Sequence, residues 1–82
     1  MEQFYVIKLK GNEYRNSYFD RFYPTFDENG KKRMNLINTV NGLYYAKEYT
    51  TKKQAEKDVK RICNIDKEAN PEIRKAGVTL LD

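Results

Sequence analysis

Histidine, serine and cysteine, which make up the commonest nucleophile–base pairs, are nearly absent from this 82-residue chain. It has no histidine, so metal sites, nucleophile–base pairs and proton relays lack their commonest component. The only serine, Ser17, lies where a cap is expected, and the only cysteine, Cys63, lies on the apolar side of a predicted helix, where a free thiol behaves as a small hydrophobic group. The sequence has no phosphate-binding glycine loop and no metal-ligand spacing. We therefore expect no catalytic residues, no metal site and no cofactor.

One enzymatic alternative remains, because some small basic nucleases use Lys, Arg, Tyr and Glu in place of histidine. The composition supplies these residue types, but no spacing singles out a catalytic group. We expect a protein that is not an enzyme and that acts by binding.

Aromatic residues suited to binding are concentrated in residues 18–26, YFDRFYPTF, which hold five of the eleven aromatic rings in the chain. Most rings are expected in the core, because aliphatic residues are scarce. Neighbours in a strand point to opposite faces, so at least one ring of each adjacent aromatic pair, Tyr44-Tyr45 included, is expected to be exposed or half-exposed. Exposed tyrosine beside arginine suits a protein interface or base stacking. The predicted partner surface comprises Tyr18, Phe19, Arg21, Phe22, Tyr23, Lys31, Lys32 and Arg33.

Positive charge is the second feature that suits binding. The net charge is +4 and the pI about 9.2, which permits attraction to nucleic acid or to an acidic protein. A predicted helix carries basic residues opposite its apolar stripe, and a solvated outer face is their simplest interpretation. If this face meets the basic turn at residues 31–33, the two could follow a phosphate backbone or contact an acidic protein. The basic helix face comprises Lys53, Lys57, Lys60 and Arg61.

The first half of the chain predicts strands and turns. Residues 4–10 alternate as a strand that ends at Gly11-Asn12. Residues 18–26 fit a helix by spacing and a strand by β-propensity; Pro24 would end a helix early, and we favour the strand. Asn29-Gly30 predicts a hairpin turn before a strand at residues 34–40. Residues 43–49 are either a returning strand or an irregular crossing with an extended end.

The second half predicts two helices and a last strand. Thr51 and Gln54 form a capping box for a helix over residues 51–65. Its apolar stripe comprises Ala55, Val59, Ile62 and Cys63. Asn70 as N-cap, Pro71 at the first position and Gly77 after the end predict a short second helix, PEIRKA. Residues 78–81, VTLL, predict a closing strand.

These elements predict a single α+β domain over residues 1–82. We expect a three- to four-stranded antiparallel sheet packed on one face by one main amphipathic helix, with a short second helix and a short C-terminal strand. No apolar run reaches the roughly 20 residues of a membrane span, and the start lacks a signal-peptide layout. A single cysteine fits a reducing compartment. We expect a cytoplasmic monomer or homodimer that does not engage a membrane.

The segment AKEYTTKKQAEK, residues 46–57, resembles a run found in small accessory proteins of bacteriophages and prophages of low-GC Gram-positive bacteria. In those proteins a run A-K-x-[F/Y]-x-[T/S]-x-x-x-A-E joins a strand to an amphipathic helix, after an opening similar to residues 4–8, FYVIK. The Lys-, Asn- and Tyr-rich composition agrees with such a source. The resemblance implies an accessory protein, of a group with many unknown roles among which host-factor and defence-system inhibitors occur, and it supplies no functional residues. Residues 18–26 lie outside it.

Three hypotheses follow from the sequence. The leading one is a non-enzymatic binding protein of phage or mobile-element type that docks onto a host protein or nucleoprotein complex, with inhibition of a host or defence system as one outcome. The alternative is a single-stranded nucleic-acid-binding module in which tyrosines stack on bases and Lys or Arg contact phosphates. The third is a homodimeric structural module that pairs through an exposed sheet edge.

Overall fold

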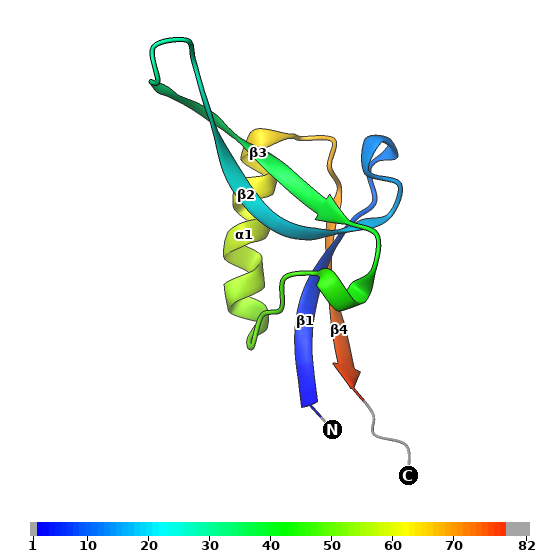
Figure 1. Cartoon of the computed structure of the whole chain (residues 1–82). Coiled ribbons are helices and arrows are strands. Elements are labelled where there is room, and N and C mark those ends of the chain that lie inside the picture. Colours follow the sequence, from blue (N-terminus) through cyan, green and yellow to red (C-terminus); the bar gives the residue numbers. More distant parts are fainter. Residues whose placement is uncertain (1, 79–82) are drawn as a thin grey trace.

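The computed structural model describes residues 2–78 (Figure 1). The strands form one antiparallel sheet in the order β3-β2-β1-β4, and the helix packs on it. This confirms the predicted α+β class, with four strands and one main helix. The elements in chain order are β1 (Glu2–Leu9), the 3-10 turn η1 (Asn12–Tyr14), β2 (Ser17–Phe26), β3 (Lys32–Val40), the 3-10 turn η2 (Leu43–Tyr45), α1 (Lys52–Ile65) and β4 (Pro71–Val78).

β4 pairs with β1 along its whole length, from Glu2 opposite Val78 to Leu9 opposite Pro71. The predicted helix PEIRKA is therefore wrong, because the same residues form the first part of β4. Proline is tolerated at the first residue of an edge strand, and pairing with β1 outweighs the local helix signals. The predicted C-terminal strand is present but begins at Pro71; residues 79–81 of that prediction lie outside the described residues.

β2 confirms that the aromatic stretch is a strand. Its pairing with β3 shifts register between Phe19 and Arg21, which makes Asp20 an extra residue, a β-bulge. The bulge reverses the alternation of side chains along the strand. Phe19 and Phe22 consequently lie on the same side of β2, with their ring centroids 4.7 Å apart.

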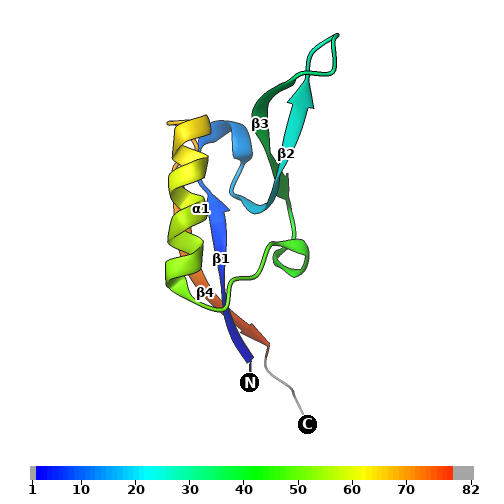
Figure 2. The same ribbon diagram turned by 90° about the vertical axis from the view of Figure 1, so that its left-hand side faces the viewer.

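The turn between β2 and β3 is the hairpin that Asn29-Gly30 predicts. One carboxylate oxygen of Asp27 accepts hydrogen bonds from the backbone amides of Asn29 and Lys31, each at 2.9 Å. Gly30 has φ 78°, which glycine adopts without strain. The hairpin stands beyond the other elements in both views (Figures 1 and 2), and the molecule measures 55 × 23 × 23 Å.

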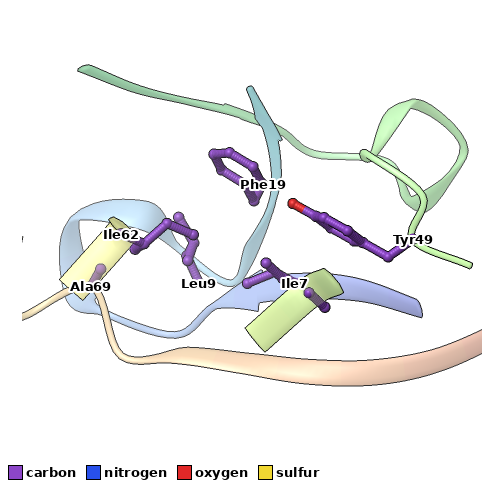
Figure 3. Close-up of a cluster of buried hydrophobic side chains, with 7 residues drawn as sticks. Ile7, Leu9, Phe19, Tyr49, Ile62 and Ala69 are labelled. Atoms are coloured by element: carbon purple, nitrogen blue, oxygen red, sulfur yellow. The ribbon is translucent and has the colours of Figure 1, made fainter. Parts of the chain in front are cut away.

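The core lies where α1 packs against β1 and the first half of β2 (Figure 3). Ile62 and Ala55 of α1 are fully buried there and Val59 packs against them, as the predicted apolar stripe requires. Burying one large apolar side chain contributes about 1.5–3 kcal/mol, so a few such residues account for much of the stability of a small domain. The buried cluster comprises Ile7, Leu9, Phe19, Tyr49, Ala55, Ile62 and Ala69.

Residues 43–49 form the irregular crossing rather than a returning strand. After η2 the chain meets β1, where Tyr49 and Tyr5 exchange backbone hydrogen bonds of 2.8 and 2.9 Å. α1 then begins as predicted, since the Thr51 hydroxyl accepts a hydrogen bond from the Gln54 amide at 3.2 Å.

The turn after β1 packs against the loop that follows α1. The amide of Gly11 donates to the carbonyl of Ala69 at 2.9 Å. A Cβ at Gly11 would lie 2.2 Å from the carbonyl oxygen of Glu68, so only glycine permits this approach.

Candidate functional site

The structure divides the predicted partner surface between the core and the hairpin. Phe19 is fully buried, so its assignment to that surface is corrected: the bulge at Asp20 leaves it facing α1. Phe22 is half-buried against the core, and the Cζ atom of Arg61 lies 4.2 Å from its ring centroid. Tyr18 is also half-buried, with Lys8 Nζ 5.7 Å from its ring.

Beyond the pair Phe22–Ile37 the hairpin no longer packs against the core. We call residues 23–36 the arm. Tyr23 and Leu36 are directly opposed across the two strands, so their side chains lie on the same face. The large apolar side chains of the arm are exposed: Tyr23 by 40%, Phe26 by 59%, Met34 by 60% and Leu36 by 37%.

Three of these residues, Phe26, Met34 and Leu36, line an open groove of about 630 Å³. A second register shift, between Pro24 and Phe26, brings an extra residue of β3 into this part of the arm. The Thr25 hydroxyl donates to the backbone carbonyl of Met34 at 2.7 Å and ties the two strands together there. We call this the arm groove; it is lined by Thr25, Phe26, Arg33, Met34 and Leu36.

Exposed apolar side chains give the arm no folding stability of their own. A two-stranded ribbon without a covering element is at best marginally stable in water. A contiguous apolar patch rimmed by charged residues is typical of an interaction surface. Met34 and Leu36 belong to the strand predicted over residues 34–40, and the predicted partner surface did not include them. The missed signal was that no other apolar segment remained to cover them.

Positive charge gathers at the end of the arm, where Lys31, Lys32 and Arg33 are all exposed. None of these three residues forms a salt bridge with any part of residues 2–78. The carboxylate of Asp27 is engaged by the turn amides, and that of Asp20 accepts from Asn38 at 2.9 Å. The tip therefore carries positive charge beside an apolar groove.

The predicted basic helix face is only partly free. Lys53, Lys57 and Lys60 are exposed and make no ion pair within the described residues. Arg61 instead lies 3.6 Å from Asp58 and stacks on Phe22. The arm tip stands away from α1 in both views, so the two basic clusters do not form one surface (Figures 1 and 2).

A buried carboxylate joins α1 to the base of the arm. Asp58 accepts hydrogen bonds from the Tyr49 hydroxyl at 2.5 Å and from Lys47 Nζ at 3.1 Å. Burial, and then the hydrogen bond to Asp58, raises the pKa of Tyr49. Arg61 forms a salt bridge with Asp58 and stacks on Phe22, so it connects these hydrogen bonds to the last ring of β2 that packs on the core. These groups are satisfied by one another, so we interpret them as structural.

A second polar cluster lies beside η1. The Tyr14 hydroxyl donates to Asp66 at 2.7 Å; burial, and then this hydrogen bond, raises the pKa of Tyr14 to about 12. The same bond holds the pKa of Asp66 below its usual value. In the part of the chain that the structure describes, no group of three His, Cys, Asp or Glu side chains is placed to hold a metal ion.

Tyr44 and Tyr45 form a separate exposed aromatic site on η2, the η2 pair. Their rings are 90% and 72% exposed and meet edge to face, with centroids 5.8 Å apart. The sequence predicted at least one exposed or half-exposed ring in this pair, and both are exposed. The η2 pair follows the end of β3 that is remote from the arm tip.

No family model, curated protein or solved structure matches the chain. Among residues 2–78, no helix combines the length and the apolar character needed to span a membrane. The case for a function therefore rests on the arm and on the charge around it.

Proposed function

We propose that the protein is a non-enzymatic binding protein that docks onto a partner protein through the arm groove and its basic rim. The observation that carries the proposal is the exposure of Phe26 and Met34, 59% and 60%, on a ribbon that extends beyond the core. Apolar surface removed from water contributes about 25 cal/mol per Å². Folding leaves these two side chains in water, so a partner that covers them would gain this free energy on binding.

The charge around the groove indicates the partner's chemistry. Arginine and aromatic residues are enriched at interface centres, and the groove combines Arg33 with Phe26. Lys31 and Lys32 extend the positive charge toward the turn. A partner with an apolar patch bordered by carboxylates complements this surface and is drawn to it electrostatically.

The resemblance of residues 46–57 to phage and prophage accessory proteins indicates the biological context in which such binding would occur. It supports an accessory protein of phage or mobile-element type that acts in the cytoplasm on a host protein or nucleoprotein complex. A small rigid body that presents one arm suits inhibition, because such a protein only has to cover a working surface of its target. The absence of histidine from the whole chain favours binding over catalysis.

The η2 pair favours a second candidate, a single-stranded nucleic-acid-binding module. Two exposed tyrosine rings can stack on bases, and the lysines of α1 can contact phosphates. Such binding would weaken steeply with rising salt, because counterions are released from the nucleic acid.

Quantitative capture from the cells that naturally make the protein tests both candidates. The bait is the wild-type chain, an arm variant carrying Tyr23→Ser and Met34→Ser, or a control carrying Tyr44→Ser and Tyr45→Ser. The proposal predicts a protein captured by the wild type and the control but not by the arm variant, whether or not nuclease is present. Capture that survives the arm substitutions contradicts the proposal. Capture that is lost with nuclease and in the control supports the nucleic-acid candidate.

A further inference from the structure

We infer that the outer edge of β3 binds an extended acidic segment of the partner protein as an added strand. The inference rests on the proposed function and assigns a binding mode to the same site. β3 is an edge strand of nine residues. Beyond its ladder with β2 it receives no backbone hydrogen bond from elsewhere in residues 2–78. Its outer amides and carbonyls are therefore available to another chain.

The opposite edge of the sheet differs in two ways. β4 begins with Pro71, which has no N–H to donate. Two of its charged side chains are also paired, because Glu72 lies 3.3 Å from Lys10 and 3.4 Å from Arg74. On the β3 side, by contrast, Lys32 and Arg33 form no ion pair with any described residue.

The arm groove lies beside this edge and determines which side chains fit. Alternate side chains of an added strand point to one face, so every second residue lies over the groove. Apolar side chains there would cover Met34 and Leu36, whereas carboxylates would meet Lys32 and Arg33. The ligand class is thus a segment in which acidic and apolar residues alternate. A second copy of this chain, with its net charge of +4, would add positive charge to a positive edge.

Synthetic peptides test the inference on the intact protein. The probes are an acidic peptide of four Glu-Val repeats, a basic peptide of four Lys-Val repeats, and the acidic peptide N-methylated at its four central residues. We expect the acidic peptide to bind at least about tenfold more tightly than either of the others, because only it offers both the charge and the backbone donors. Equal binding of the acidic and N-methylated peptides, or no binding of any peptide, overturns the inference.

Amide hydrogen exchange of β3 provides a readout that docking on the face alone would not produce. Amides of an edge strand alternate between the ladder and solvent, so the acidic peptide should slow exchange at every second residue between residues 35 and 39, where β3 has no extra residue. Uniform or absent protection contradicts strand addition. Arg33→Glu should weaken peptide binding about tenfold or more, whereas the matched control Lys57→Glu, with the same change in charge, should not; equal effects also contradict it.

Loss of capture in the arm variant together with unprotected β3 amides would reject strand addition and leave the proposed function standing. Capture that persists in the arm variant would reject the proposed function itself. The two failures are therefore distinguishable.

Discussion

Both halves of β2 carry aromatic rings, but the surroundings of those rings are opposite. The first half contains Ser17 and Phe19, both buried, and it meets β1, β3 and the crossing before α1. The second half, from Tyr23 onward, is paired only with β3 and exposes its aromatic rings. An aromatic ring of β2 is therefore buried where a further element packs on the β2–β3 pair, and exposed where no such element is present.

The boundary between the halves is built by specific contacts. The bulge at Asp20 aligns Phe19 with Phe22, and the guanidinium of Arg61 covers Phe22. Past this point α1 supplies no further apolar residue to the buried cluster. The hairpin continues as a two-stranded ribbon because the side chain of Asp27 and the pairing of β2 with β3 provide hydrogen bonds for its backbone.

The largest expected contrast is between a ring in each half. Phe19→Ala should lower the free energy of unfolding by about 3–5 kcal/mol, because it opens a cavity in the core. Phe26→Ala should change it by no more than about 0.5 kcal/mol, because that ring is exposed. Urea unfolding followed by circular dichroism measures both. Should Phe19→Ala fail to fold, Phe19→Leu should still cost more than Phe26→Leu; similar costs at the two positions would break the comparison.

The next contrast is between the buried carboxylate of α1, Asp58, and the half-exposed carboxylate at the bulge of β2, Asp20. Asp58→Ala should lower the free energy of unfolding by about 1–3 kcal/mol, because it leaves the buried Tyr49 hydroxyl without its acceptor. Asp20→Ala, at the half-exposed base of the arm, should cost less than about 1 kcal/mol. Urea unfolding of the two variants measures both losses. A larger loss of unfolding free energy for Asp20→Ala than for Asp58→Ala would contradict the structural role assigned to Asp58.

Arg61 should show a smaller effect at the junction of body and arm. Arg61→Ala should cost about 1 kcal/mol, because it removes a partly exposed cation–π contact and one partner of Asp58. Lys57→Ala, on the solvated side of α1, should be nearly neutral. Nuclear magnetic resonance should also show faster amide exchange around Phe22 and Ile37 in Arg61→Ala. Unchanged exchange there would mean that Arg61 does not hold the arm's base.

Alkaline pH should lower the free energy of unfolding through ionisation of Tyr14. Burial, and then the hydrogen bond to Asp66, raises its pKa from the usual 10 of a tyrosine to about 12, so the folded state retains the phenolic proton more tightly. The resulting stabilisation is complete below about pH 10 and is lost as the pH rises toward 12. Thermal unfolding of wild type and Tyr14→Phe across that window should show a shallower decline for the variant. Identical declines would contradict the link to Tyr14.

Locally encoded elements could be predicted from the sequence. The capped helix and the Asn29-Gly30 turn depend on neighbouring residues, and both are confirmed. β4 was predicted as a helix because Asn70, Pro71 and Gly77 carry helix-boundary signals, whereas its strand form depends on pairing with distant β1. Long-range pairing of this kind leaves only weak marks in the local sequence.

The exposure of side chains on the candidate surface could be predicted only in part, because it too depends on contacts between distant parts of the chain. Arg21, Tyr23 and the basic turn are exposed, as the predicted partner surface requires. Phe19 was misplaced because a bulge one residue later reverses which side chains face inward, and alternation alone cannot reveal it. Met34 and Leu36 were overlooked because their exposure depends on where α1 ends relative to the hairpin.

Hydrogen exchange of the protein before and after capture of its partner distinguishes docking through the arm from docking on any other surface. In the free protein, amides of the arm should exchange faster than those of β1 and of the first half of β2, because fewer buried contacts protect them. In the complex, our account predicts added protection within residues 21–37 and none on the solvated face of α1. Protection gained on α1 or the η2 pair, with the arm unchanged, would contradict it.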